Sequence, residues 1–141
     1  MENLNIKRAS VIIIENNYID TLVLRARLGK YFNLCIAPDL ELAEKIISEF
    51  NFDMIVTDTN SCKRRSWNLK DIKTKSKNKD IKVCGLSASY KNKDFLINAG
   101  VNDVLTKPVC KEDVFNILNW SMPENYNFST LKGVSTLCSV F

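Results

Sequence analysis

Short apolar runs alternate with amphipathic stretches along most of this chain. Five runs, at residues 9–14, 33–37, 54–58, 82–86 and 103–106, have the length of strands and are apolar almost throughout, which is typical of strands buried on both faces. The stretches between them carry apolar residues at helical spacing. Five strands alternating with five helices predict an α/β fold, with a parallel sheet, right-handed crossovers and helices on both faces.

The helices are expected over residues 18–30, after Asp39, within 66–76, over 90–99 and over 111–121. Asp39 can cap the second of these, and Gly100 is a favourable residue just beyond the fourth. The side chains expected to form the packed faces are Ile19, Leu22, Val23, Ala26, Ala43, Ile46, Ile47, Phe50, Trp67, Leu69, Ile72, Val114, Phe115, Ile117 and Leu118.

Polar residues stand where four of the predicted strands end. Glu15 and Asn16 follow the first strand, Asp58 ends the third, Ser87 closes the fourth, and Lys107 follows the fifth. In an open α/β sheet, ligands bind outside the carboxyl ends of the strands. We therefore expect a carboxylate, an amide, a hydroxyl and an ammonium group to converge on one pocket.

These strand ends, together with the stretch Gly100-Val101-Asn102-Asp103-Val104-Leu105-Thr106-Lys107-Pro108, resemble the receiver domain of two-component response regulators over roughly residues 8–120. The resemblance implies the flavodoxin-like, CheY-like fold, doubly wound, with strand order 2-1-3-4-5. It places the domain over residues 1–121 and leaves residues 122–141 as a C-terminal tail, either docked or disordered.

The resemblance also implies roles for the site residues. Asp58 matches the phosphoacceptor, Ser87 the hydroxyl that contacts the phosphoryl group, and Lys107 the lysine that pairs with a phosphoryl oxygen or with the aspartate. Glu15, Asn16, Asp58 and the backbone carbonyl of Asn60 match the positions that hold Mg²⁺, which prefers oxygen ligands. The Lys107-Pro108 peptide bond is expected to be cis.

Three departures from the family pattern stand out. Asn16 replaces the second acid and removes one negative charge, so we expect Mg²⁺ binding to be weak or absent. Residues 59–67 lack the proline and glycine that receivers usually carry in this loop. Val104 occupies the position of the aromatic switch residue and has no aromatic ring to reorient.

Two functions therefore remain open. In the first, this is an atypical receiver in a phosphorelay, in which Asp58 accepts a phosphoryl group from a histidine kinase or phosphotransfer protein and output passes to a downstream protein. In the second, it is a pseudo-receiver that binds proteins without phosphorylation. A structural Asp58–Lys107 ion pair is a further alternative, because such pairs also occur at sheet edges.

Composition narrows the class of protein. The chain has 141 residues and 45% apolar residues, which suits a single domain. It has no apolar run of about 20 residues, and residues 1–5 lack the basic start and apolar block of a secretory signal. Its five cysteines lack C-x-x-C spacing, and it has no histidine, so a zinc site is not expected. We expect a cytoplasmic protein with free thiols, three of them buried in or just after strands. Four unclustered glycines argue against a nucleotide- or flavin-binding enzyme.

The net charge of +4 is concentrated in a basic stretch over residues 63–82, expected beside the pocket. A basic stretch can attract acidic proteins or nucleic acid, but no set of aromatic side chains accompanies this one, so a solvated surface is favoured and nucleic acid is an unlikely partner. In the tail, Leu131, Val134, Leu137, Cys138 and Phe141 recur at helix-like spacing. The sequence does not determine the oligomeric state.

Overall fold

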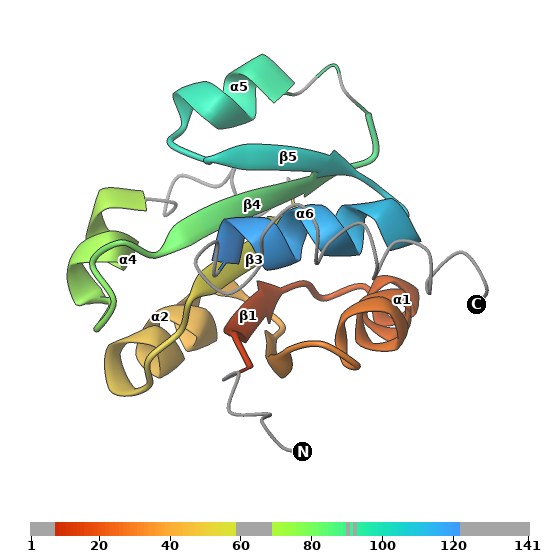
Figure 1. The fold of residues 1–141 in the computed structure, drawn as a ribbon. Coiled ribbons are helices and arrows are strands. Elements are labelled where there is room, and N and C mark those ends of the chain that lie inside the picture. The colour runs from red at the N-terminus through yellow and green to blue at the C-terminus, as the bar shows by residue number, and fades with distance from the viewer. Residues whose placement is uncertain (1–7, 59–68, 90, 92, 122–141) are drawn as a thin grey trace.

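The structure, a computed structural model, describes residues 8–58, 69–89, 91 and 93–121 (Figure 1). Within these ranges, five strands form a parallel sheet in the order β2-β1-β3-β4-β5. The strands are β1 Ser10–Ile14, β2 Asn33–Ala37, β3 Met54–Asp58, β4 Lys82–Ser87 and β5 Asp103–Thr106. The predicted class, parallel pairing and strand order are confirmed.

The connecting segments that the structure describes contain the predicted helices. They are α1 Tyr18–Leu28, α2 Leu40–Glu49, α4 Leu69–Lys75, α5 Lys93–Asn98 and α6 Lys111–Ser121. Gly100, just past α5, has φ 99, a left-handed conformation that glycine adopts without steric cost. The predictions for Asn60, Trp67 and the tail lie outside the described residues.

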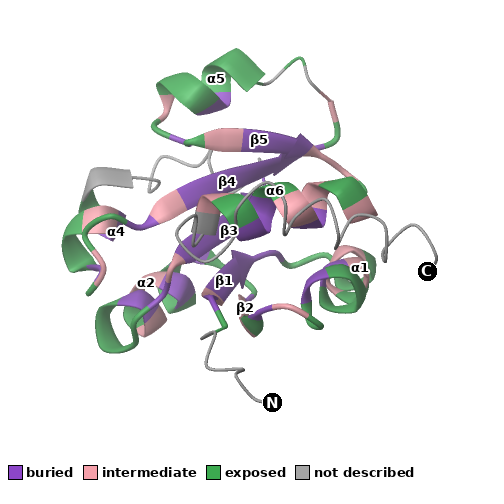
Figure 2. Ribbon diagram, viewed as in Figure 1, coloured by how far each residue is buried: buried purple, intermediate pink, exposed green. Residues whose placement is uncertain are grey.

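The central strands β1, β3 and β4 are buried almost throughout, whereas β2 is mostly half-buried, and alternation divides the side chains of the strands between two cores (Figure 2). Ile12 and Ile14 of β1 pack with α2, α4 and α5, as Leu40, Ile72 and Leu96 show. The other face of the sheet packs against α1 and α6, and its cluster includes Val11, Ile13, Val56, Leu24, Leu28, Val114, Ile117 and Leu118. This two-sided burial explains why the strands are continuously apolar rather than alternating.

The predicted packed face of α1 is wrong. Leu24 and Leu28 are its buried residues, whereas Ile19 is 64% and Leu22 is 45% exposed. Ala26 is also exposed and Val23 is only half-buried. The helix is rotated relative to the prediction because Leu24 and Leu28, one turn apart, insert into the core shared with α6.

Two smaller predictions also need correction. Phe50 is 60% exposed because it is the C-cap of α2, with an extended backbone that takes it off the helical face. Cys110 is exposed rather than buried, since it lies at the start of α6, where its thiol donates a hydrogen bond to Asp113 Oδ2 at 3.1 Å. Cys84 is buried as expected, and burial raises the pKa of its thiol. No helix in the described ranges is long and apolar enough to cross a membrane.

Candidate functional site at the carboxyl ends of the strands

The register of the sheet brings the predicted site residues to one edge. Ile14 lies opposite Thr57, so the next residues, Glu15 and Asp58, reach the edge at the same level. Asp58 in turn lies opposite Leu86, one residue before Ser87. The backbone N–H of Lys107 donates to the carbonyl of Ser87 at 2.8 Å, which fixes the loop after β5 to the end of β4.

Lys107 forms two ion pairs at this edge. Its Nζ lies 2.8 Å from Glu15 Oε2 and 2.8 Å from Asp20 Oδ2. The other oxygen of Glu15, Oε1, accepts a hydrogen bond from the backbone N–H of Asn17 at 3.1 Å. Glu15 is 3% exposed, so its carboxylate is buried and both of its oxygens have partners. The Lys107-Pro108 peptide bond is cis, as predicted.

The electrostatics of this group favour a charged lysine. Burial disfavours the ammonium form, but the hydrogen bonds to Asp20 and Glu15 and their negative charges outweigh it and raise the pKa of Lys107. Two carboxylates share the one ammonium, and Asp58 adds a third carboxylate to the same edge. Among the residues that the structure describes, three carboxylates and one ammonium therefore come to this edge, which suits a site for a cation or for a phosphoryl group whose charge a cation neutralises.

Asp58 is 6% exposed and ends a strand in which every residue is buried. Asp58 lies on the same face of β3 as Met54 and Val56, and this face packs against α1 and α6. The sequence prediction that the third strand delivers a carboxylate to the carboxyl edge of the sheet is therefore confirmed for its backbone position.

Ser87 is 1% exposed, and the hydrogen bonds of its hydroxyl close a local turn. Its Oγ donates to the carbonyl of Ser89 at 2.5 Å and accepts from the N–H of Ser89 at 3.1 Å. Such a turn orders the loop after β4. For the Ser87 hydroxyl to donate to a phosphoryl oxygen, it would have to give up its bond to Ser89.

The predicted metal ligands are only partly described. Glu15 and Asp58 are in place, Asn16 is exposed just beyond β1, and Asn60 lies outside the described residues. Within the ranges described, no group of three or more His, Cys, Asp or Glu side chains has a metal-binding arrangement. The donor types are all oxygens, which suits a hard cation such as Mg²⁺, but Lys107 already pairs with Glu15 and Asn16 brings no charge.

Val104, at the position of the aromatic switch residue, also differs from the family pattern. Val104 on β5 is 5% exposed and belongs to the core cluster that includes Leu96 and Val101. Gly85 lies in the same part of that core, since a Cβ atom there would be 3.4 Å from side-chain atoms of both of these residues. Val104 is thus a packed core residue, and it has no aromatic ring that could move between a buried and an exposed position.

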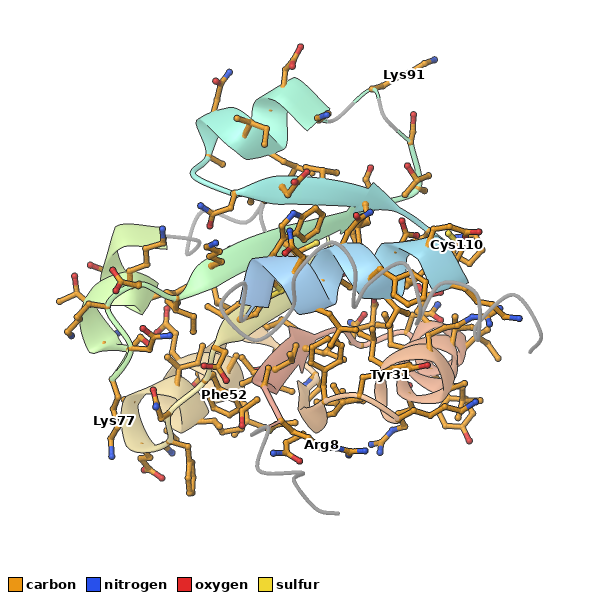
Figure 3. All side chains as sticks on the ribbon, in the orientation of Figure 1. Arg8, Tyr31, Phe52, Lys77, Lys91 and Cys110 are labelled. Atoms are coloured by element: carbon orange, nitrogen blue, oxygen red, sulfur yellow. The ribbon has the colours of Figure 1, made fainter. Side chains whose placement is uncertain are left out.

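The described part of the basic stretch is not next to the pocket, contrary to expectation. Lys77 lies at the opposite end of the molecule from Cys110, which marks the carboxyl edge (Figure 3). The reason is that α4 runs back from the carboxyl ends, so the residues before β4 gather at the amino ends of the strands. Lys75 pairs with Glu44 at 3.2 Å, and Lys79 donates to the carbonyl of Thr74.

Asp20 is the site residue that sequence analysis missed. It stands three residues after Asn17, the spacing of a capping box, which accounts for a helix start without any role at a site. Only one half of that box forms: the Asn17 side chain accepts from the Asp20 N–H at 2.9 Å. The Asp20 carboxylate instead pairs with Lys107, 87 residues away in sequence.

Compared as a sequence, the chain matches no family model and no curated protein. Compared as a structure, it has the fold of response regulator receiver domains. A response regulator from Thermotoga maritima matches with a TM-score of 0.67 and 23% identity, over 81% of this chain and 98% of that chain.

Two other solved receiver domains match the fold with similar scores. The receiver domain of a Pseudomonas aeruginosa sensor histidine kinase, which has a magnesium ion coordinated in its active site cleft, matches with a TM-score of 0.66 and 19% identity, over 83% of this chain and 99% of that one. The receiver domain of a Saccharomyces cerevisiae response regulator, co-crystallised with a histidine phosphotransfer protein, matches with a TM-score of 0.67 and 22% identity, over 86% and 94%. These likenesses establish the fold, and function must be argued from the site.

Proposed function

We propose that this protein is an atypical receiver domain in phosphorelay signalling, with Asp58 as its phosphoacceptor. The observation that carries the proposal is the convergence of Asp58, Glu15, Ser87 and Lys107 on one edge of a receiver fold. The domain acts as a signalling module rather than as an enzyme with a separate substrate, and its output passes through protein contacts.

The proposed reaction transfers a phosphoryl group from a phosphohistidine of a histidine kinase or phosphotransfer protein. A carboxylate oxygen of Asp58 forms a bond to phosphorus as the P–N bond breaks, and the electron pair of that bond returns to the imidazole. Lys107 and the Ser87 hydroxyl then stabilise the phosphoryl oxygens. In the resting protein, Lys107 pairs with Glu15 and Asp20, and the Ser87 hydroxyl donates to the carbonyl of Ser89, so we propose that both side chains reorient when the phosphoryl group is present.

Mg²⁺ is the cofactor that this site would take, held by Asp58, Glu15, the Asn16 amide and the carbonyl of Asn60. When bound, it would neutralise charge on the phosphoryl oxygens. We propose that binding is weak, because Asn16 contributes no charge and Glu15 already has an ammonium partner at 2.8 Å.

A pseudo-receiver that binds partner proteins without phosphorylation is the second candidate. Two observations favour it: both oxygens of Glu15 are engaged, and the switch position is the buried Val104. In that case, the ion pairs of Lys107 would be permanent and would serve only to stabilise the edge of the sheet.

A magnesium titration followed by beryllofluoride, a phosphoryl mimic, distinguishes the two, with amide NMR as the readout and Asp58→Asn as the control. The receiver function predicts saturable shifts at Asp58, Ser87 and Lys107 that are absent in the variant. A folded protein whose signals at these residues do not respond would be a pseudo-receiver.

The metal can be tested separately through Asn16→Asp, which restores the missing charge. We expect the variant to bind Mg²⁺ more tightly than the natural protein, as measured by the same NMR titration without beryllofluoride. Unchanged affinity would show that residue 16 does not belong to the metal site.

A further inference from the structure

Asp20 is the residue at this edge whose role the proposed function does not explain. It lies in the first turn of α1, not at a strand end, yet its carboxylate is 2.8 Å from the Lys107 ammonium. We propose that Asp20 is a positioning residue that, together with Glu15, holds Lys107 in the resting protein and opposes its transfer to a phosphoryl group on Asp58. The second half of this inference rests on the proposed function.

The hydrogen bonds at the start of α1 leave the Asp20 carboxylate available for this role. In a complete capping box, the acid at this position would accept from the N–H of the N-cap residue. Here the Asn17 N–H donates to Glu15 Oε1 at 3.1 Å instead. Glu15 thus accepts the hydrogen bond that Asp20 would accept in a complete capping box, and the Asp20 carboxylate pairs with Lys107 instead.

The surroundings of the pair make its geometry well defined. Only 24% of the Lys107 side chain and 34% of the Asp20 side chain are exposed. Both residues border a cavity of about 10 Å³ that is otherwise lined by Val23, Leu24, Leu86, Pro108 and Val109. This apolar lining limits the access of water to the pair from one side, so losing the carboxylate matters more than at a fully open surface.

Release of Lys107 would leave two carboxylates, Glu15 and Asp20, without their shared cation. A metal ion held by Glu15 could neutralise the charge of that carboxylate, but Asp20 would still lose its cationic partner. Asp20 therefore adds to the free energy required to move Lys107 toward Asp58. In a chain where Asn16 stands in place of an acid after β1, one of the two acids that pair with Lys107 comes from the helix.

The test uses the whole chain and two variants, Asp20→Asn and the matched control Glu41→Gln. Glu41 is the first-turn acid of α2, so its variant loses a comparable charge next to a helix N-terminus without touching Lys107. The first readout is the side-chain ammonium of Lys107 in ¹⁵N NMR, assigned by its loss in Lys107→Arg. We expect this signal to be ordered in the natural protein and in Glu41→Gln, and mobile in Asp20→Asn.

The second readout is the affinity for beryllofluoride at saturating Mg²⁺. We expect Asp20→Asn to bind it about two- to fivefold more tightly, as the loss of a partly exposed ion pair implies, while Glu41→Gln is unchanged. Asp20→Glu should restore affinity toward that of the natural protein. An ammonium of Lys107 that is equally ordered in Asp20→Asn, or equal or weaker affinity in that variant, would overturn the proposal.

The two readouts separate this inference from the proposed function. Mobile Lys107 in Asp20→Asn, with no beryllofluoride binding in any variant, would support the restraint of Lys107 by Asp20 and overturn phosphoacceptance by Asp58. Binding by Asp20→Asn alone would support both, and would identify Asp20 as the reason that the resting protein does not respond.

Discussion

Helices α1 and α2 begin alike and pack differently. Each has an N-cap side chain, Asn17 or Asp39, that accepts a hydrogen bond at 2.9 Å from a backbone N–H three residues later. Helix α2 buries Leu40, Ala43 and Ile47, close to the face predicted from its spacing. Helix α1 buries only Leu24 and Leu28 and exposes Tyr18, Ile19 and Leu22.

The difference shows what each helix contributes. The first turn of α2 carries Glu41, which faces solvent, whereas the first turn of α1 carries Asp20, which pairs with Lys107. Helix α2 thus mainly closes one core, while α1 both closes the other core and supplies a charged group to the site. The exposed apolar residues of α1 start in its first turn, which also carries Asp20 and follows the polar residues after β1.

The largest expected effect comes from the buried face of α2. Ile47→Ala should lower the free energy of unfolding by about 2–5 kcal/mol, because it leaves a cavity at a fully buried position. Ile19→Ala on α1 should change it by no more than about 0.5 kcal/mol. Urea denaturation of both variants measures the contrast, and equal losses would mean that α1 packs through Ile19 after all.

Removing Lys107 should have the next largest effect. Lys107→Met leaves the buried Glu15 carboxylate without its cation, which should destabilise the protein by about 1.5–3 kcal/mol. The exposed Lys45→Met on α2 serves as the control, with little change expected. If the two variants had the same denaturation midpoint, Glu15 would not depend on Lys107.

Removing the N-cap side chain of α1 or of α2 should lower stability by similar amounts, but only the cap of α1 should affect the site. Asn17→Ala and Asp39→Ala should each destabilise by about 1 kcal/mol, since each leaves a first-turn N–H without its acceptor. Only Asn17→Ala should also shift the NMR signal of the Lys107 ammonium, because Asn17 orients the turn that carries Asp20. A shift of equal size in Asp39→Ala would show that the cap of α1 has no special link to the site.

The smallest effect is a dependence of stability on alkaline pH. The folded-state pKa of Lys107 is raised above the ordinary lysine value of 10.5, so its ion pairs contribute fully below that pH and are lost as the pH rises through the folded-state pKa. Unfolding measured across this range should show a steeper loss in the natural protein than in Lys107→Met. Parallel curves would contradict a raised pKa.

Much of the fold was predictable because each strand carries a local signal. Continuous apolar runs identified strands buried on both faces, and Gly100 and Asp39 marked helix ends. The face of α1 was not predictable from spacing, because that chain segment has more apolar positions than the core can cover. Leu24 and Leu28 are buried as a result of the place of α1 beside α6.

At the site, the sequence by itself determined that Glu15, Asp58, Ser87 and Lys107 stand at strand ends, and parallel strands must bring such ends to one edge. Only the tertiary structure decided their partners. Lys107 pairs with Glu15 and Asp20, and the Ser87 hydroxyl bonds within its own loop. The physical reason is that a strand pattern determines where a residue reaches the edge, whereas ion pairs depend on side-chain distances between segments far apart in the chain, as with Asp20 and Lys107.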